Sequence, residues 1–210
     1  MYRTTSALCA IALAATLTAH ADFSYSKTQK VTGGSMAAMA GNTANRDGKS
    51  YFKGEKIAEV NGDSTILIDF GAQLDGYCSD LTRTVVVGRA DDRQREVYAV
   101  VEAAQRRARE GVRAGMTGRE ADALAREVIA QRGYGEAFGH SLGHGLGLEV
   151  HEAPRLSPTA EGVLPAGAVV TIEPGIYLPG WGGVRLEDDV LLAPDGPECL
   201  SDGRTALIEV

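Results

Sequence analysis

The sequence has 210 residues, of which 44% are hydrophobic and 23% charged, enough for one globular domain with or without an additional arm. Its formal net charge of −7 argues against nucleic acid as a partner, because nucleic-acid binders usually present a basic face. Six arginines between residues 93 and 113 are interleaved with glutamates, which indicates a solvated helix face. The three cysteines form no CxxC pair, so neither a zinc ribbon nor a redox motif is indicated. Cys78 and Cys199 could form a disulfide, but free thiols are expected.

Residues 1–21 have the pattern of a secretory signal peptide. A short positive start precedes an apolar run from Ala7 to Leu17, and Ala19-His20-Ala21 resembles a small-residue cleavage site. The run is too short to cross a bilayer as a helix. The alternative interpretation is a buried helix of the fold, rich in alanine and leucine.

Residues 22–60 are rich in Gly, Ser, Thr, Asn and Lys and are interpreted as a loop-like N-terminal arm. We expect the main domain to cover residues 61–210. It starts at a turn at Asn61-Gly62-Asp63, and β-branched strands are predicted at Ser64–Phe70 and Thr82–Val87.

Two amphipathic helices are predicted next. Asp91 or Asp92 can cap the first, whereas Thr117 and Glu120 form a capping box for the second, which ends at Gly133. The apolar positions that recur at helical spacing are Val97, Val100, Val101, Ala104 and Ala108 in the first helix, and Ala121, Leu124, Ala125, Val128 and Ile129 in the second.

The remainder of the chain predicts strands and hairpins. Strands are expected around Leu146–Val150, Val169–Glu173 and Val184–Leu192. Because helices and apparent hairpins are mixed without a short repeat, the predicted fold class is α+β.

Two aspartates flank the first predicted hairpin. An aspartate inside an apolar strand such as Ile66–Phe70 is costly unless it is paired or binds a metal. A turn centred between Leu74 and Asp75 would place Asp69 directly opposite Asp80, with Cβ atoms about 5 Å apart on one face. A tight turn on Asp75-Gly76 would instead place Asp69 opposite Thr82.

A second hairpin repeats this arrangement with glutamates. A loop centred on Gly180 places Glu173 opposite Glu187. Between the two hairpins, His140, His144 and His151 lie in a glycine-rich stretch that does not suit the helical HExxH zinc motif. Three histidines there favour a functional site over isolated structural histidines.

The charges of these residues suit a pair of divalent ions. Four carboxylates balance two divalent cations, and one imidazole completes a set rich in hard oxygen donors, which favours manganese, with cobalt or zinc as alternatives. Two such ions can bridge a water molecule, lower its pKa and hold it as hydroxide, which makes a hydrolase the natural class.

Five motifs carry a family resemblance that covers about two-thirds of the chain, from residue 62 to about residue 206. They are Leu67-Ile68-Asp69-Phe70-Gly71, Gly76-Tyr77-Cys78-Ser79-Asp80-Leu81-Thr82-Arg83-Thr84, His140–Glu152, Val170–Tyr177 and Gly183–Asp189. Together they resemble the pita-bread metallopeptidases, specifically the branch of Xaa-Pro aminopeptidases and prolidases. The methionine aminopeptidase branch shares the ligand types but is less similar around residues 77–84.

The resemblance implies a complete set of metal ligands. Asp69 would bind one ion, His144 and Glu173 the other, and Asp80 and Glu187 would bridge both. Glu173 would also transfer protons between the water and the leaving group.

The resemblance also implies roles around the metals. His140 and His151 would contact substrate and stabilise the tetrahedral intermediate, and Arg185 would hold Glu187 or Asp80. The substrate would be a peptide with proline at its second position, cleaved before that proline. Whether the enzyme acts as an aminopeptidase or a dipeptidase is left open by these motifs.

The N-terminal part departs from the family pattern. The family has two similar halves, whereas the stretch before Ser64 is too short for the helices of the first, so we expect a truncated first half. Tyr51 stands near the place of a family histidine, and no histidine occurs between His20 and His140. One alternative is therefore a non-catalytic pita-bread module that binds peptides or proteins, and another is a truncated product that folds poorly alone.

The expected partners are a peptide substrate and a second copy in a homodimer, with no nucleic acid and no membrane. For the compartment, the resemblance implies the cytoplasm and the signal-like start implies export.

Overall fold

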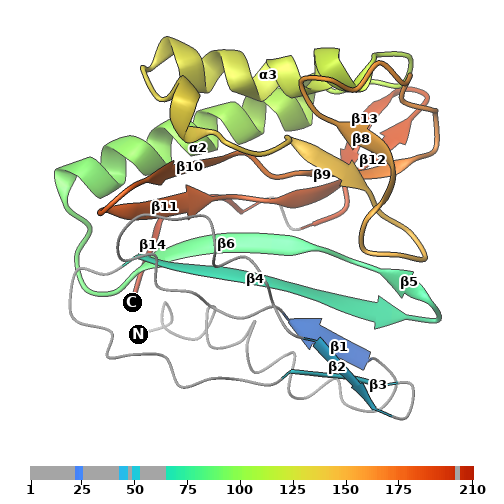
Figure 1. Cartoon of the computed structure of the whole chain (residues 1–210), viewed down its shortest axis with the longest axis horizontal. Helices are drawn as coiled ribbons and strands as arrows, with labels where there is room; N and C mark the ends of the chain where they lie inside the picture. The colour runs from blue at the N-terminus through green and yellow to red at the C-terminus, as the bar shows by residue number, and fades with distance from the viewer. Residues whose placement is uncertain (1–21, 26–42, 47–48, 53–64, 202–203) are drawn as a thin grey trace.

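The helices and strands form the mixed α+β arrangement that the sequence predicts. The computed structural model describes residues 22–25, 43–46, 49–52, 65–201 and 204–210, and gives side chains from residue 65 onward. The predicted signal peptide and the side chain of Tyr51 lie outside these residues. Figure 1 shows two long helices packed over one side of the strands.

The helices are α2 (Asp92–Gly111), α3 (Gly118–Gln131) and the short 3₁₀ helix η2 (Gly135–Ala137). The strands are β1 (Asp22–Tyr25), β2 (Thr43–Arg46), β3 (Lys49–Phe52), β4 (Thr65–Leu74), β5 (Tyr77–Cys78), β6 (Leu81–Val86), β7 (Gly143–Gly145), β8 (Glu152–Leu156), β9 (Val169–Ile172), β10 (Gly175–Leu178), β11 (Gly182–Arg185), β12 (Asp188–Ala193), β13 (Gly196–Cys199) and β14 (Ile208–Glu209).

The strands are arranged in two larger sheets and two hairpins. One sheet has the order β1-β4-β6-β14, with β5 paired to β4, and the other has the order β13-β12-β9-β7-β8. The hairpin β10-β11 forms a ladder of its own, and β2 pairs with β3. Three short strands thus lie within residues 22–52, where the sequence predicted loop-like structure.

The two helices begin where their capping residues predict. The side chain of Asp91 accepts a hydrogen bond from the Gln94 amide at 2.7 Å, and the Gln94 side chain accepts one from the Asp91 amide at 2.8 Å. Thr117 and Glu120 form the same reciprocal box at α3. Gly133 follows the end of α3 with a φ of +83°, a backbone conformation that favours glycine.

The predicted apolar faces of both helices form the core. In α2 all five predicted positions are buried, and in α3 three are buried while Leu124 and Val128 pack at its margin. These faces cover β9, β10 and β12, whose core side chains include Val170, Ile172, Ile176 and Val190. The core therefore holds in place β9 and β12, the strands next to which the two glutamates of the second hairpin lie.

The first hairpin has a tight turn on Asp75-Gly76. Leu74 pairs with Tyr77, and Asp69 is opposite Thr82. The direct pairing of Asp69 with Asp80 is therefore wrong, and the alternative register is confirmed. Asp75 adopts a φ of +52° and Gly76 one of +88°, as a two-residue turn of this kind requires.

The second hairpin has the predicted register but is interrupted. Gly175 pairs with Arg185, and Ile172 pairs with Asp188, so Glu173 and Glu187 face each other in the gap between the two ladders. Pro174 falls in this gap and has no amide hydrogen to donate. The Glu187 amide instead donates to Thr82 of the neighbouring sheet at 3.1 Å. The strand structure predicted around Val184–Leu192 is therefore present as two strands, β11 and β12, with a break between Arg185 and Asp188.

The strand predicted around Leu146–Val150 is also wrong. β7 ends at Gly145, and the Gly147 amide donates to the Glu149 carbonyl at 3.2 Å, which forms a local turn. Leu148 is 64% exposed, so the alternation of apolar residues in this stretch does not form one buried face. Cys78 and Cys199 are free thiols, as expected. No helix in the described part of the chain is both long and apolar enough to span a bilayer.

We expect the substitution Asp91→Ala to lower the free energy of unfolding by about 1 kcal/mol, because the first turn of α2 loses its side-chain acceptor. Urea denaturation followed by circular dichroism measures this. Asp92→Ala is the control, since Asp92 is exposed and lies one position inside the helix. Equal losses in the two variants would contradict the capping role.

Candidate metal centre

The structure brings together the five side chains that the sequence predicts as metal ligands. Asp69 lies in β4, and Asp80 immediately precedes β6. His144 is the middle residue of β7. Glu173 follows β9 and Glu187 precedes β12, at the interruption caused by Pro174. Asp69 is thus paired inside a long strand, whereas the other four residues stand beside a strand end or on a short strand.

Their donor atoms form two overlapping groups. Oxygens of Asp69, Asp80 and Glu187 lie within 4.8 Å of one another, and so do donor atoms of His144, Glu173 and Glu187. Glu187 belongs to both groups, and Asp80 Oδ2 is also 3.9 Å from His144 Nε2. The geometry thus provides two neighbouring donor sets joined by one carboxylate.

The carboxylates raise one another's pKa. Burial, followed by the charges of Asp69 and Glu173, raises the pKa of Asp80 to about 7. Burial and the charges of Glu173 and Asp80 raise the pKa of Glu187 well above its ordinary value. Without cations, protons are therefore retained at the centre of the cluster.

His144 and Glu173 form a hydrogen-bonded pair. Their Nε2 and Oε1 atoms are 3.2 Å apart. Burial opposes charge on both groups, but this hydrogen bond raises the pKa of His144 and, with the charge of Arg185, lowers the pKa of Glu173.

This donor set fits two divalent cations. Four carboxylates and one imidazole converge on a space that is mostly shielded from solvent, where like charges need positive charge or protons to coexist. The raised pKa values show that cationic charge would be favourable at this point. Asp69, Asp80 and Glu187 would hold one ion, and His144, Glu173 and Glu187 the other.

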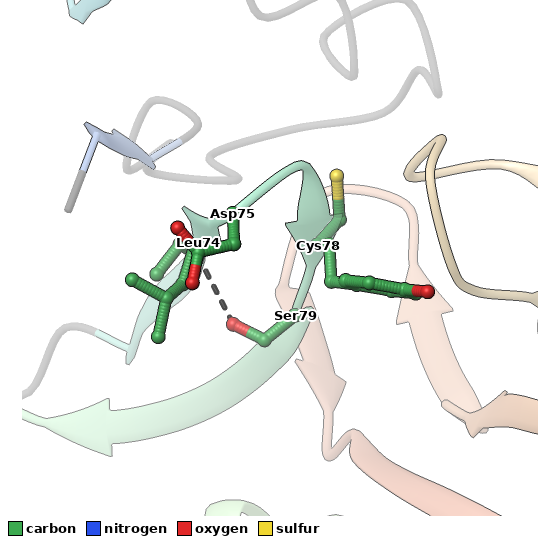
Figure 2. A pocket seen from close by; sticks show the side chains of 6 residues that line it. Leu74, Asp75, Cys78 and Ser79 are labelled. Atoms are coloured by element: carbon green, nitrogen blue, oxygen red, sulfur yellow. Dashed lines mark hydrogen bonds between the residues drawn. The ribbon is translucent and has the colours of Figure 1, made fainter.

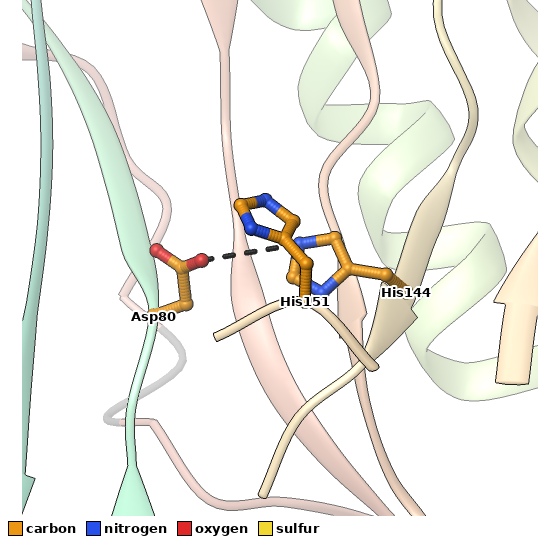
Figure 3. Close-up of side chains that lie close together, drawn as sticks. All are labelled: Asp80, His144 and His151. Atoms are coloured by element: carbon orange, nitrogen blue, oxygen red, sulfur yellow. Dashed lines mark ion pairs between the residues drawn. The ribbon is translucent and has the colours of Figure 1, made fainter. Parts of the chain in front are cut away.

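His140 and His151 lie beside this cluster, as Figure 3 shows for His151. The rings of His144 and His151 are 4.3 Å apart, and donor atoms of Asp80, His144 and His151 form a third close group. His140 Nδ1 is 2.8 Å from the Ser141 carbonyl, and its buried Nε2 has no hydrogen-bond partner among the described residues. Burial lowers the pKa of His140, which favours the neutral ring.

Arg185 is buried in the centre, but it binds a different carboxylate from the two that the sequence analysis expected. Its Nη2 contacts Asp69, rather than Glu187 or Asp80. Its Nε donates to Thr82 Oγ1 at 3.1 Å, and Thr82 donates to Glu187 at 2.5 Å. Because Thr82 has taken the place opposite Asp69 in the hairpin, it lies between the arginine and Glu187.

Two threonines support the ligands and were missed by the sequence analysis. Besides Thr82, Thr171 donates to Glu173 Oε1 at 3.1 Å and accepts the His144 amide at 3.1 Å. Each threonine is two residues from a candidate ligand along the chain. Residues two apart on a strand share a face, so this spacing could have identified both threonines as neighbours of the ligands.

Asp188 anchors the strand that follows Glu187. Its buried carboxylate accepts hydrogen bonds from Arg83 at 2.7 Å, Gln105 at 2.7 Å and Arg109 at 3.0 Å. Arg83 also donates to the Glu187 carbonyl at 2.6 Å. On the opposite face, Asp189 Oδ2 accepts the Asp80 amide at 3.1 Å. Consecutive acidic residues thus point alternately toward the helices and toward the candidate site.

A surface hollow lies beside the first hairpin and is separate from the acidic cluster. It is lined by Ala72, Leu74, Asp75, Tyr77, Cys78 and Ser79. Figure 2 shows these side chains around the hairpin tip, where the Ser79 hydroxyl accepts a hydrogen bond from the Ala72 amide at 3.1 Å. It contains none of the five candidate ligands, so the chemistry is assigned to the buried cluster.

Residues 3–194 match the model of metallopeptidase family M24, and the chain belongs to this family. The chain is 52% identical to the Xaa-Pro dipeptidase of Pyrococcus furiosus over 143 residues, which are 68% of this chain and 41% of that protein. The solved structure of the Xaa-Pro dipeptidase from Bacillus anthracis matches with a TM-score of 0.71 and 48% identity, over 78% of this chain and 45% of that one.

These relatives have the pita-bread fold, which confirms the predicted fold. The N-terminal domain of the FACT complex subunit SPT16 from chickpea matches with a TM-score of 0.72 at 20% identity, over 90% of this chain and 46% of that one. At that identity the likeness concerns the fold alone. The chain spans less than half the length of each of these relatives.

We expect Asp80→Asn to raise the melting temperature of the metal-free protein at pH 8, because it removes one of several repelling charges. The same substitution should abolish most of the stabilisation by Mn²⁺, since a ligand to the ions is lost. Differential scanning fluorimetry with and without Mn²⁺ after chelator treatment measures both effects.

Asp75→Asn serves as the control for Asp80→Asn, because Asp75 is exposed at the turn of the same hairpin. It should leave the Mn²⁺-dependent shift unchanged. An Asp80→Asn protein that Mn²⁺ stabilises as strongly as the wild type would contradict the assignment of Asp80.

Proposed function

We propose that the chain is a dinuclear metal-dependent peptidase that hydrolyses the bond before a proline at the second position of a peptide. The observation that carries this proposal is the pair of donor groups joined by Glu187. Relatives named Xaa-Pro dipeptidase support the substrate class. The oxygen-rich donor set favours manganese over softer metals.

Two divalent ions bound there would lower the pKa of a water molecule for attack on the peptide carbonyl. Glu173 would move the proton; its carboxylate is 3.2 Å from His144 and 4.0 Å from the Arg185 guanidinium. Its lowered pKa keeps it ionised, which is the form that accepts a proton. The proton then goes to the amine of the leaving proline.

His140 and His151 would bind the reacting carbonyl. Because Nδ1 of His140 faces the Ser141 carbonyl and carries a hydrogen there, Nε2 would donate from the protonated ring to an oxygen that becomes negative during the reaction. His151 lies on the other side, against His144, and is more exposed to solvent. Arg185 orients Asp69 and supports Glu187 through Thr82.

The activity is tested with the purified chain, Mn²⁺, an Xaa-Pro dipeptide and a longer peptide with proline second. We expect release of the N-terminal residue, abolished by a chelator and by Glu173→Gln, and a much lower rate when alanine replaces the proline. The ratio of rates on the two proline peptides distinguishes a dipeptidase from an aminopeptidase. Bound Mn²⁺ without hydrolysis of either peptide would favour a binding module instead.

We expect His140→Ala to lower kcat by roughly 10²–10³-fold, because a preorganised donor to the developing oxyanion is lost. Mn²⁺ binding should persist, since His140 belongs to neither donor group. Steady-state kinetics and equilibrium dialysis measure the two properties. Tyr134→Phe, which removes an exposed hydrogen bond to Glu96, is the control, and equal kcat values in both variants would contradict the role of His140.

A further inference from the structure

An ion pair on α3 faces the segment that leads into the candidate site. Asp122 is 1% exposed, and its carboxylate accepts Arg126 Nε at 2.6 Å and Arg126 Nη2 at 2.9 Å. The two residues are four apart on the helix, a spacing that usually makes a surface pair of little consequence. Here the pair is turned toward the chain between η2 and β7.

The pair binds the backbone of that segment at alternate residues. Arg126 Nη1 donates to the Phe138 carbonyl at 2.8 Å, and Nη2 donates to the His140 carbonyl at 2.8 Å. Asp122 Oδ1 accepts the Leu142 amide at 3.0 Å. The guanidinium also lies 4.1 Å from the centre of the Phe138 ring. Since residues 138–142 belong to no strand, these side chains provide contacts that a ladder would otherwise supply.

Leu142 connects the Asp122–Arg126 ion pair to two candidate ligands, Glu173 and His144. Its amide binds Asp122, while its carbonyl accepts the Glu173 amide at 2.8 Å. Its side chain is completely buried, and β7 begins at the next residue, with His144 second in that strand. A single residue therefore joins the ion pair of α3 to Glu173 on one side and to His144 on the other.

The close packing beyond Leu142 leaves little room for adjustment. A Cβ atom added to Gly143 would lie 1.9 Å from the Thr171 carbonyl oxygen, and Thr171 itself binds both His144 and Glu173. A displacement of Leu142 would thus move the backbone of both ligands.

From these contacts we infer that Asp122 and Arg126 are positioning residues, which set the distance between His144 and Glu173 by holding Leu142 and the carbonyls of Phe138 and His140. The inference rests on the proposed function, because it concerns the same metal centre. The role requires the planar fork of arginine, which binds a carboxylate with two nitrogens and still reaches two carbonyls. A lysine is a single point charge and cannot replace those contacts together.

The test compares Mn²⁺ affinity in Arg126→Lys, Asp122→Asn and a control of reduced stability. Equilibrium dialysis of the full chain gives the dissociation constants, and thermal unfolding of the metal-free proteins gives their stability. Ile129→Val is the control, because Ile129 is fully buried on the same helix and its apolar side chain makes no hydrogen bond to residues 138–142. Arg126 is partly exposed, so its lysine variant can retain the fold.

We expect Mn²⁺ to bind about tenfold more weakly to Arg126→Lys and Asp122→Asn, as when a residue that orients a metal ligand is replaced. Ile129→Val should bind Mn²⁺ like the wild type, even where its melting temperature falls as far. Unchanged affinity in both ion-pair variants, or an equal loss in Ile129→Val, would overturn the inference.

Peptide hydrolysis is measured on the same samples. Wild-type protein that binds Mn²⁺ but hydrolyses no proline peptide would contradict the proposed reaction, while weaker Mn²⁺ binding by the ion-pair variants would still support the positioning role. Full hydrolysis by the wild type with equal affinities throughout would contradict the positioning role alone.

Discussion

Mutual repulsion among the carboxylates of the candidate metal centre is the main energetic constraint in this structure. Three carboxylates, those of Asp69, Asp80 and Glu187, offer oxygens within 4.8 Å of one another. Two like charges at that distance repel by about 3 kcal/mol at an effective dielectric constant of about 20. In the metal-free chain, Arg185 and retained protons offset part of this energy. Two divalent cations would offset all of it and would also provide the chemistry of a peptidase.

The charges come together where the pairing of strands is interrupted, between the β10-β11 and β9-β12 ladders. Pro174 breaks one ladder, so that Glu173 and Glu187 project from the gap and the Glu187 amide binds Thr82 across the sheets. Behind them, Asp188 is fixed by two arginines and a glutamine. The apolar faces of α2 and α3 pack against the same strands and supply the burial energy that keeps the acidic cluster closed.

Local rules predicted much of this arrangement. Capping residues located both helix starts, and helical spacing identified the buried faces, because these features depend on neighbours along the chain. The candidate ligands followed from carboxylates placed in apolar strands. The strand register was harder to predict, since moving the centre of the turn by one residue changes the partner of Asp69 from Asp80 to Thr82. The family resemblance implied Glu187 or Asp80 as the partner of Arg185, whereas its guanidinium contacts Asp69. The anchoring of Leu142 by Asp122 depends on how α3 meets a loop, which no spacing encodes.

We propose that Glu187 joins two metal ions in one buried site. Crystals of the full chain grown with Mn²⁺, measured at the manganese absorption edge, test it most directly. We expect two anomalous peaks, one beside Asp69 and Asp80 and one beside His144 and Glu173, with Glu187 next to both. A single peak, or no peak among these five side chains, would contradict it.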